Sequence, residues 1–369
     1  MPDPAWPAAI FARIAVPRVP GSPEISDVQA ALAKQLGEFG YTVQRESFKT
    51  SARPLIAISI AGGALGWMAL LLAPLLVVDL TGWVVSLVGC ATLALVMLTA
   101  VGIANGYLPS QVESVEAVNL CAKRGDASVW LVAHSDSKGQ GVSLAGRVLA
   151  VAALGAGLVV LLACLLVRAF APLAWWAVLP MVLLMTTGGA ALSRKALTNE
   201  SPGAVDNATG IIAALVAAEQ LRNRSDVGVL ITGAEEFAMA GAKAWVGAHV
   251  AEGMFINFDG LDARGRYRVM THAVTRGVGG DRSAFVGNSL VKALAAAGAE
   301  AGLGNLPPGV LVDGVMLAKA GMVGVSLSRG DWETLKVVHT ERDVPQRVDV
   351  GAAVLAGLAT ARVVDGLLG

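Results

Sequence analysis

The sequence predicts an α/β fold, with a mostly parallel sheet flanked by helices and two transmembrane helical hairpins inserted into it. One observation is that short apolar runs alternate with segments of helical periodicity after residue 194, which is typical of a parallel sheet covered by helices. Another is that four apolar runs end in a His, Asp or Glu, as strands do when they present functional groups at their carboxyl ends. The third is the presence of two pairs of long uncharged stretches.

The composition indicates that part of the chain lies outside water. The 369 residues carry a formal net charge of +0 and are 55% hydrophobic, but only 15% are charged. A soluble enzyme is normally about one quarter charged. The neutral balance gives no support for a nucleic-acid partner, because such a partner requires a basic face. The three cysteines are too few for a disulfide framework and are interpreted as buried thiols.

Four stretches are long enough to be transmembrane helices. Leu55–Val78 and Gly82–Ile103 each exceed 20 residues without a charged side chain, and Val148–Val167 and Pro172–Leu192 form a second pair joined near Arg168. Such lengths cross a bilayer core of about 30 Å. The alternative is that these are buried helices of a large soluble domain, but their length and pairing favour the lipid bilayer as a partner.

The remainder is expected to form one domain in three pieces, residues 1–53, 105–146 and 194–369, separated by hairpins at 54–104 and 147–193. Its expected strands are 41–48, 115–121, 127–133, 227–232, 253–259, 266–271, 310–312 and 322–327. Its expected helices are 24–39, 211–222, 238–250, 283–301 and 348–368, with a short one led by Asp313. Residues 1–23 are rich in Pro and Ala and lack the layout of a signal peptide.

A cluster of possible metal ligands is centred on Asp206, in the glycine-flanked segment Gly203–Gly210. A short polar residue before a helix is often only a cap. Likewise, adjacent glutamates are often a solvated turn, and a single His after an apolar run is often structural. Taken together, however, the residues offer imidazole nitrogen and carboxylate oxygen, which zinc prefers. The other candidates are His134, Glu235, Glu236, Asp259 and His339.

The order His-x-Asp, Gly-Ala-x-Asp-Asn, Glu-Glu, Asn-x-Asp and His-Thr resembles the co-catalytic zinc aminopeptidases of metallopeptidase family twenty-eight. These are the relatives of aminopeptidase Y and of bacterial leucyl aminopeptidases. The resemblance covers nearly all of the predicted α/β domain. The two hairpins depart from the family pattern. So does Val338, where some members carry a Tyr that helps to polarise the substrate carbonyl.

The resemblance implies a site with two zinc ions bridged by Asp206. It makes His134 and Asp259 ligands of one ion, and Glu236 and His339 ligands of the other. Glu235 is then the general base, which must stay unligated to accept a proton from water. A shared carboxylate can hold two ions about 3.5–4 Å apart.

Several further polar residues are assigned from their positions. Asp136, two residues after His134, is expected to orient that imidazole from the second shell. Asp343 suits a second-shell or helix-capping role. Asp262 is an alternative to Asp259 as a ligand, although Asp259 directly ends the predicted strand. The remaining histidines, His249 and His272, match no motif and are interpreted as structural or surface residues.

The chain is therefore expected to be a membrane-anchored, two-zinc peptidase, in the first place an aminopeptidase that hydrolyses peptides or small amides. One alternative is a non-peptidase amidohydrolase or an aminoacyl cyclase on the same scaffold. Another is a catalytically silent membrane receptor or scaffold. The complete ligand set and the additional carboxylate of Glu235 count against the silent alternative, because a scaffold has no need of that group.

Charge distribution predicts the orientation in the membrane. An even number of spans places all three pieces of the domain on one side. Basic residues flank the spans on that side, whereas the opposite hairpin turns carry only Arg168. The positive-inside rule then places the domain in the cytoplasm, in agreement with an unpaired Cys121, although the resemblance implies an extracytoplasmic location. The flanking residues are Arg45, Lys49, Arg53, Arg147, Arg194 and Lys195.

Overall fold

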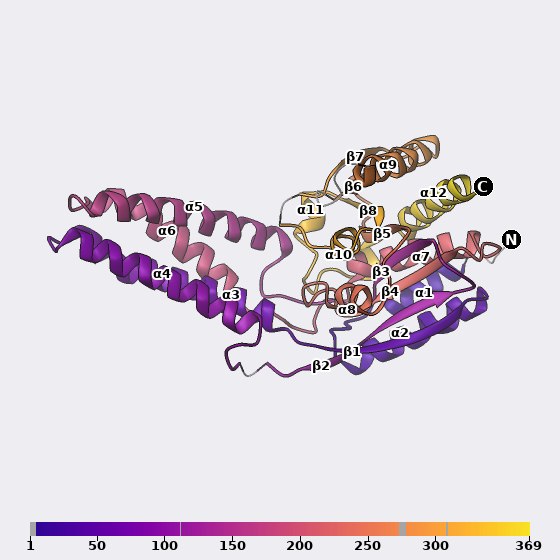
Figure 1. The fold of residues 1–369 in the computed structure, drawn as a ribbon, viewed down its shortest axis with the longest axis horizontal. Helices are drawn as coiled ribbons and strands as arrows, with labels where there is room; N and C mark the ends of the chain where they lie inside the picture. The colour runs from indigo at the N-terminus through magenta and orange to yellow at the C-terminus, as the bar shows by residue number, and fades with distance from the viewer. Residues whose placement is uncertain (1–4, 111, 273–277, 308) are drawn as a thin grey trace. The chain divides into compact units, whose positions relative to one another are not determined.

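A computed structural model describes residues 5–110, 112–272, 278–307 and 309–369 of the chain (Figure 1). The chain folds into two compact units. The first, called the α/β unit, comprises residues 1–50, 114–139 and 199–369. The second, called the helical unit, comprises residues 51–113 and 140–198. Each unit is therefore assembled from separate stretches of the chain.

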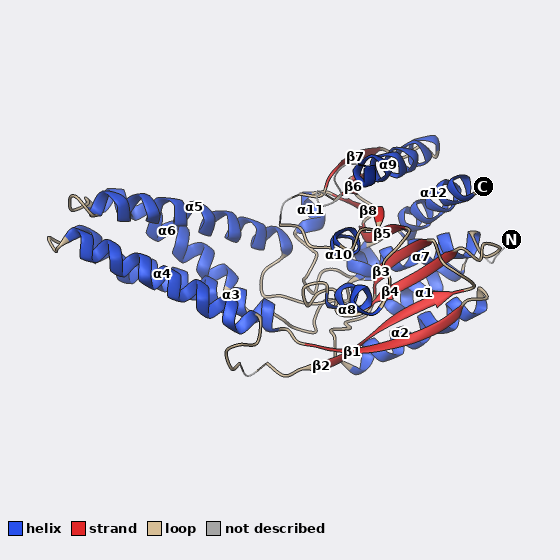
Figure 2. Cartoon of the chain, viewed as in Figure 1, coloured by secondary structure: helices blue, strands red, loops and turns tan. Residues whose placement is uncertain are grey.

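One eight-stranded sheet forms the centre of the α/β unit (Figure 2), with the strand order β1-β2-β4-β3-β5-β8-β6-β7. Its strands are β1 (Thr42–Thr50), β2 (Val115–Lys123), β3 (Val129–His134), β4 (Val227–Thr232), β5 (Met254–Leu261), β6 (Arg266–Thr271), β7 (Ala301–Asn305) and β8 (Val323–Gly330). The four central strands β4, β3, β5 and β8 are parallel, and β6 and β7 are parallel to each other. The pairs β1–β2, β2–β4 and β6–β8 are antiparallel.

The sheet is therefore mixed, and the mostly parallel arrangement expected from the sequence holds for its centre. A parallel pair needs a crossover segment, usually a helix, whereas an antiparallel pair does not. Residues 51–113, between β1 and β2, belong to the helical unit, so no helix of the α/β unit crosses over between these strands. The two strands pair antiparallel over their whole length, from Thr42 opposite Lys123 to Thr50 opposite Val115.

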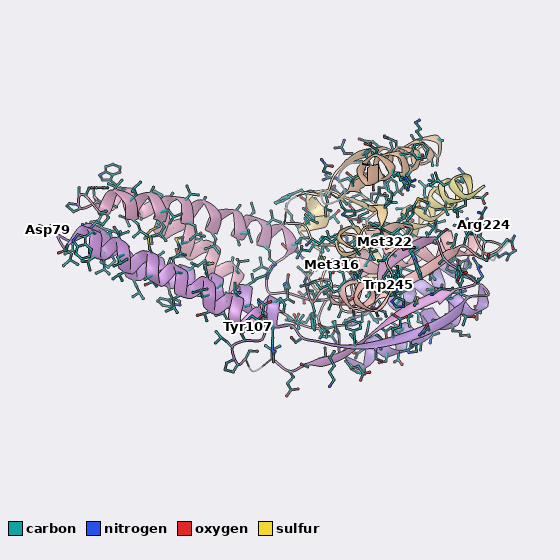
Figure 3. All side chains as sticks on the ribbon, in the orientation of Figure 1. Asp79, Tyr107, Arg224, Trp245, Met316 and Met322 are labelled. Atoms are coloured by element: carbon teal, nitrogen blue, oxygen red, sulfur yellow. The ribbon has the colours of Figure 1, made fainter. Side chains whose placement is uncertain are left out.

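Helices cover both faces of the central strands, so both faces are buried. Along β3, Leu131 belongs to one apolar cluster, whereas Trp130 and Val132 belong to another. Alternate side chains of a strand point to opposite faces, so the two clusters lie on the two sides of the sheet. Figure 3 shows Trp245 and Met322 near each other, and both belong to the second cluster.

The helices divide between these clusters. Those that contribute to the first cluster are α1 (Trp6–Ile14), α2 (Pro23–Glu38), α7 (Gly210–Gln220), α9 (Val278–Ala296) and α12 (Val350–Leu368). Those that contribute to the second are α8 (Ala240–Ala248) and α10 (Asp313–Lys319).

Three local predictions differ from the structure. Helix α1 forms within residues 1–23, where no regular element was expected, and buries Phe11 and Ile14. The helix expected over 283–301 ends at Ala296, and β7 follows it. Residues 310–312 form no strand, and the Leu311 side chain is 56% exposed there. A short apolar run without a buried partner surface does not form a strand.

The helical unit contains four helices at the four uncharged stretches. They are α3 (Arg53–Val77), α4 (Gly82–Ala104), α5 (Leu144–Arg168) and α6 (Trp175–Leu192). Helices α3 and α6 pack closely through glycine, since a Cβ atom on Gly189 would lie 2.4 Å from the carbonyl oxygen of Gly62. The Ser59 hydroxyl also donates to the Leu192 carbonyl at 3.0 Å. Small residues and interhelical hydrogen bonds of this kind are typical of membrane helix pairs.

Arg168 joins the two hairpins at their turns. Its side chain is buried and donates to the carbonyl oxygens of Val78 at 2.9 Å and Leu80 at 2.7 Å, with a longer contact of 3.4 Å to that of Leu75. The last carbonyls of a helix lack partners within the helix, so Arg168 satisfies the end of α3. Asp79 lies in the same turn (Figure 3).

Five helices in the described part of the chain are long and apolar enough to cross a membrane: α3, α4, α5, α6 and α12. Helix α12 nevertheless packs in the core of the α/β unit, with Ala353, Ala356 and Val364 fully buried. The helical unit instead exposes large apolar side chains, among them Trp67 (68% exposed), Leu98 (70%) and Trp176 (79%). Length and composition alone therefore do not separate the two classes of helix.

Candidate metal centre

Three candidate ligands lie at one edge of the sheet because β4, β3 and β5 are parallel neighbours. His134 is the last residue of β3, and Asp259 lies near the carboxyl end of β5. Glu236 follows β4, which ends at Thr232 opposite His134. The alternation of apolar runs and acidic residues in the sequence thus produces a cluster in space.

Asp206 belongs to a kinked turn, η1 (Ala204–Thr209), that leads into α7. Gly203 precedes it in the left-handed conformation, with φ +57°, and a Cβ atom there would lie 2.5 Å from the Asp206 carbonyl oxygen. Only glycine fits this position. Asn207 follows through a cis peptide bond, and its side chain donates to the Phe258 carbonyl at 2.8 Å and accepts from the Gly260 N–H at 3.1 Å. These bonds hold the turn against β5.

His339 follows the short helix α11 (Trp332–Leu335), which begins with a reciprocal capping box between Asp331 and Thr334. The backbone of His339 is left-handed, with φ +65°. A non-glycine residue rarely adopts this conformation, and such residues concentrate at functional sites. The neighbouring Val338 is buried and apolar, so it cannot polarise a carbonyl group.

The five candidate ligands form two groups that share Asp206. His134, Asp206 and Asp259 form one group, and Asp206, Glu236 and His339 form the other. Within each group, the possible ligand atoms lie within 4.8 Å of one another. His134 Nε2 lies 3.0 Å from Asp206 Oδ1, and His339 Nε2 lies 3.0 Å from Asp206 Oδ2. The two oxygens of one carboxylate thus face two imidazoles, and the Asp206 side chain forms no helix cap.

The donor atoms fit metal ions. His134 Nε2 and Glu236 Oε1 are buried and make no hydrogen bond of acceptable geometry, although other polar atoms lie 3.0 to 3.3 Å away. Buried polar atoms are normally hydrogen-bonded. A buried nitrogen or oxygen atom without a hydrogen bond is consistent with an atom that binds a metal ion. Imidazole nitrogens and single carboxylate oxygens are the donors that zinc accepts. We therefore describe the cluster as a candidate metal centre.

Charges in the site shift the pKa values of its carboxyls in opposite directions. Burial raises the pKa of Asp206, but hydrogen bonds and attraction from His134 and His339 outweigh it and hold that pKa well below its usual range. In contrast, burial and the charge of Asp206 raise the pKa of Asp259 to about 7. Groups with perturbed pKa values are typical of functional sites.

Glu235 differs from the candidate ligands, since it belongs to neither group. It is buried, with 7% of its surface exposed. Burial raises its pKa well above the usual range, opposed by His134 and reinforced by Glu236. A carboxyl of this kind binds a proton more readily than an exposed glutamate does.

Lys138 lies in the site but did not emerge from sequence reasoning. Its ammonium group makes a close ion pair with Glu236 Oε2, and its side chain is only 10% exposed. Burial would lower the pKa of Lys138, but the charges of Glu236 and Glu235 outweigh this effect and raise it. Lys138 thus binds one oxygen of Glu236, while the other, Oε1, has no hydrogen-bond partner in the described part of the chain and is a candidate ligand atom. The available sequence signal is its position four residues after His134.

Asp136 supports the site differently from the expectation. His134 Nδ1 lies 3.1 Å from the backbone carbonyl of Asp136, whereas the carboxylate is 3.7 Å away, too far for a hydrogen bond. The carboxylate instead accepts from the backbone N–H groups of Glu235 at 3.0 Å and Glu236 at 3.1 Å. Asp136 therefore orients the imidazole through its carbonyl and the glutamates through its side chain.

Asp343 holds the Asp206 turn in the same way. Its carboxylate accepts from the backbone N–H groups of Val205 at 2.8 Å and Asp206 at 3.2 Å. Burial raises the pKa of Asp343 to about 6 despite these bonds. Two buried carboxylates, Asp136 and Asp343, thus each bind two successive amides of a segment that carries candidate ligands.

The other acidic residues near the motifs have separate partners. Asp262 accepts from the Thr334 hydroxyl at 2.6 Å and from Arg347 at 3.2 Å, and it belongs to neither ligand group. Asp313, which sequence reasoning treated only as a helix start, is buried and accepts from the Thr232 hydroxyl. Burial raises its pKa to about 6.

The two histidines outside the motifs have structural contacts. His249 pairs with Glu46 at 3.2 Å and stacks on Trp245. His272 is buried beside Phe255 and lies 3.3 Å from the Ser326 hydroxyl.

Comparison with known structures places the fold among zinc aminopeptidases and glutaminyl cyclases. A zinc aminopeptidase from Bacillus subtilis superimposes with a TM-score of 0.58 and 15% identity, covering 98% of this chain and 94% of its own. An aminopeptidase from Aneurinibacillus sp. strain AM-1 gives 0.55 and 12%, with coverages of 98% and 94%. A glutaminyl cyclase from Porphyromonas gingivalis gives 0.55 and 13%, covering 98% of both chains.

One of two sequence comparisons agrees with this fold. A search of curated proteins found no match. Residues 186–364 match the family model described as Peptidase family M28. This range includes Asp206, Glu235, Glu236, Asp259 and His339, whereas His134 lies outside it. Residues 186–364 are therefore similar to peptidase family M28, and the chain has a mixed α/β fold with a sheet flanked by helices like that of zinc aminopeptidases.

Proposed function

We propose that the α/β unit is a zinc-dependent peptidase, and specifically an aminopeptidase that hydrolyses peptides or small amides. The observation that carries this proposal is the pair of ligand groups sharing Asp206, with the protonatable carboxyl of Glu235 in neither group. The match of residues 186–364 to the model of peptidase family M28 supports hydrolysis of peptide bonds as the reaction. The silent receptor or scaffold is disfavoured, because a scaffold has no need of a complete donor set beside an additional buried carboxyl.

Two zinc ions are the proposed cofactors. His134 and Asp259 would hold one, Glu236 and His339 would hold the other, and Asp206 would contribute to both. When bound, zinc supplies a Lewis acid that polarises the substrate carbonyl and increases the acidity of water.

Glu235 performs the proton transfers. Its carboxylate accepts a proton from the attacking water as the water oxygen bonds to the carbonyl carbon. It returns that proton to the nitrogen of the leaving amine as the carbon–nitrogen bond breaks. Burial gives this carboxyl a raised pKa, which suits a group that must both accept and donate a proton. Asp136 keeps Glu235 in place through the backbone N–H group.

A glutaminyl cyclase is the second candidate. The observation in its favour is that the Porphyromonas gingivalis cyclase superimposes along 98% of both chains. Cyclisation differs chemically from hydrolysis, because the amino nitrogen of an amino-terminal glutamine attacks its own side-chain amide and ammonia leaves. No water is consumed, so the two activities give different products from one peptide.

One experiment separates the two candidates. The purified protein in detergent, loaded with zinc, is incubated with a peptide that begins with glutamine and with the matched leucine peptide. An aminopeptidase releases free amino acids from at least one peptide, as mass spectrometry would show. A cyclase acts only on the glutamine peptide and releases ammonia. If zinc-loaded protein changes neither peptide nor a broader set of aminoacyl amides, both proposals fail.

The variant Glu235→Gln tests the proposed base. We expect it to retain zinc and to lose several orders of magnitude in turnover, since proton transfer fails. Glu219→Gln is the matched control, because Glu219 is also a buried glutamate but binds Trp6, at 3.2 Å. Near-normal turnover in Glu235→Gln would remove Glu235 from this role.

We further propose that the helical unit anchors the protein in a bilayer with four membrane-spanning helices. Helices α3 and α5 have 25 residues each, which corresponds to roughly 37 Å at 1.5 Å per residue, enough for a core of about 30 Å. The exposed side chains of Trp67, Leu98 and Trp176 would then contact lipid. The positive-inside rule supports a cytoplasmic location for the α/β unit.

Thiol labelling in intact cells tests this orientation. Cysteine is introduced at Thr81, in the turn between α3 and α4, or at Lys34, whose side chain is 73% exposed in the α/β unit. An impermeant reagent should label position 81 and spare position 34 until the cells are permeabilised. The opposite pattern would place the α/β unit outside the cytoplasm, and equal labelling at both positions would contradict a spanning arrangement.

A further inference from the structure

Arg18 is a fully buried arginine in the segment between α1 and α2. Within the described residues, its guanidinium donates to backbone carbonyls alone. The acceptors are Ser135 at 2.7 Å, Val16 at 3.0 Å, Gly203 at 3.0 Å and, in a closer contact, Pro202. Buried charges require such compensation, and guanidinium donors in a fixed planar group set the spacing of the carbonyls they bind.

Three of these four carbonyls, those of Ser135, Pro202 and Gly203, belong to the segments that carry metal-centre residues. Ser135 directly follows His134, and Gly203 begins the turn that contains Asp206. The backbone is bound in the same region, since the Arg18 N–H donates to Ser137 Oγ at 3.2 Å and the Ser137 N–H donates to the Arg18 carbonyl at 3.3 Å. Arg18 therefore connects two segments that are more than 60 residues apart in the sequence.

Gly203 shows how closely these parts fit. A Cβ atom at Gly203 would lie 3.0 Å from Arg18 Nη1 and 2.5 Å from Ser137 Cβ. The guanidinium therefore packs directly against the turn backbone, with no space for a side chain at that position.

The charge of Arg18 is also matched to the site. Burial lowers its pKa to about 10, while the carboxyls of Asp136, Asp343, Asp206 and Glu236 oppose this effect. The group remains a cation at neutral pH. Asp136 and Asp343 bind backbone amides of the segments that carry candidate ligands. The Arg18 guanidinium is a buried positive charge that balances these two carboxylates, and it comes from a segment without a candidate ligand.

We propose that Arg18 is a positioning residue of the metal centre, which sets the distance between His134 and Asp206 by binding the carbonyls beside them. The inference rests on the proposed function, because it assumes that these two residues hold a metal. It makes the amino-terminal segment part of the site, although the segment contains no candidate ligand.

Arg124 provides a matched control. It too binds carbonyls, those of Phe39 at 3.1 Å and Leu221 at 2.7 Å, together with the Tyr41 hydroxyl at 2.9 Å. None of these partners adjoins a candidate ligand. Variants at Arg124 therefore report the general effect of removing a carbonyl-binding arginine from the α/β unit.

The experiment measures the zinc affinity of the metal-free full-length protein in detergent, by competition with a chromophoric chelator, together with the melting temperature. The variants are Arg18→Lys, Arg18→Ala and Ser137→Ala, beside Arg124→Lys and Arg124→Ala. We expect the Arg18 variants to bind zinc about 10- to 100-fold more weakly, as when groups that orient metal ligands are removed. Arg124 variants with equal loss of melting temperature should keep the wild-type affinity. Millimolar guanidinium ion should partly restore affinity to Arg18→Ala and leave Arg124→Ala unchanged.

Equal zinc affinity in wild type and Arg18→Lys, or equal losses in the Arg18 and Arg124 variants, would overturn the inference and leave the proposed function standing. Failure of the wild type to bind zinc would overturn the proposed function and with it the inference. If Arg18→Ala does not fold, Arg18→Lys and Ser137→Ala decide the question, with affinity losses beyond the Arg124 controls as the supporting result. Wild-type zinc affinity in both Arg18→Lys and Ser137→Ala would then overturn the inference.

Discussion

Replacing Lys138 with Met should destabilise the metal-free protein and tighten its binding of zinc. The side chain of Lys138 pairs with Glu236 in a buried site. Burial raises the pKa of Glu236, but Lys138 is the largest opposing influence, and the net effect lowers that pKa from 4.5 to about 2. Removing the cation leaves a buried carboxylate without its main partner. Zinc would supply the missing positive charge. The free energy of zinc binding should therefore become more favourable by about the amount of stability that the metal-free protein loses.

The size of the effect follows from the shift. A fall from 4.5 to about 2 corresponds to about 3 kcal/mol, at roughly 1.4 kcal/mol per pKa unit. His339 contributes part of the lowering and burial opposes it, so this value sets the order of magnitude of the effect of Lys138. Loss of one partner from a buried ion pair generally destabilises by about 3–5 kcal/mol, which is the same order. For a unit of about 250 residues, such a loss lowers the melting temperature by roughly 6–12 °C.

The assay compares melting curves of Lys138→Met and wild type at neutral pH, first with a chelator and then with excess zinc. Lys336→Met is the control, because Lys336 pairs with Glu333 on the surface, with both side chains about half exposed. Surface pairs contribute about 0–1 kcal/mol. The expected result is a large loss with chelator that shrinks with zinc. A loss no greater than that of Lys336→Met, or one that grows with zinc, would refute the reasoning.

Three further results are expected. Asp206→Ala should lose both zinc ions, because this carboxylate belongs to both ligand groups; metal analysis that finds two equivalents would remove Asp206 from the centre. Asp343→Asn should weaken zinc binding about 10- to 100-fold without removing a ligand, as measured by chelator competition, since its carboxylate holds the Asp206 turn. Burial lowers the pKa of His272 from 6.5 to about 4 in the folded protein. As the pH falls, His272 therefore binds a proton in the unfolded chain before it does so in the folded protein. His272 should therefore contribute a decrease of up to about 3 kcal/mol in the unfolding free energy between pH 6.5 and 4, which denaturant titrations should find as the difference between wild type and His272→Gln.

The elements that the sequence predicted well are those whose pattern is local. Strand β4 (Val227–Thr232) agrees with the expected range, because a buried central strand is a continuous apolar run between polar turns. Strand β7 was missed because it depends on pairing with β6. Its sequence, Ala301 to Asn305, contains two glycines, which disfavour a strand in isolation.

The candidate site shows the same division between local and distant information. The motifs identified the residues of both ligand groups, because each motif is short and follows a recognisable strand or turn. Asp136 does contact the His134 imidazole, through its backbone carbonyl, but the sequence did not reveal that its carboxylate binds amides about 100 residues later in the chain. Arg18 gave no signal at all, because its partners are carbonyls, and any residue type supplies a carbonyl.

The interleaved order of the sheet has a consequence for synthesis of the protein. Strand β3, which ends at His134, lies between β4 and β5, and both of these emerge from the ribosome later. Strands β1 and β2 can pair with each other first, yet they contain no candidate ligand. The His134 segment must therefore wait without a strand partner while the whole of α5 and α6 is made. The central sheet, and with it the candidate metal centre, can form only after both apolar hairpins have left the ribosome, so a nascent chain arrested between the two hairpins should show no zinc-dependent protection from protease.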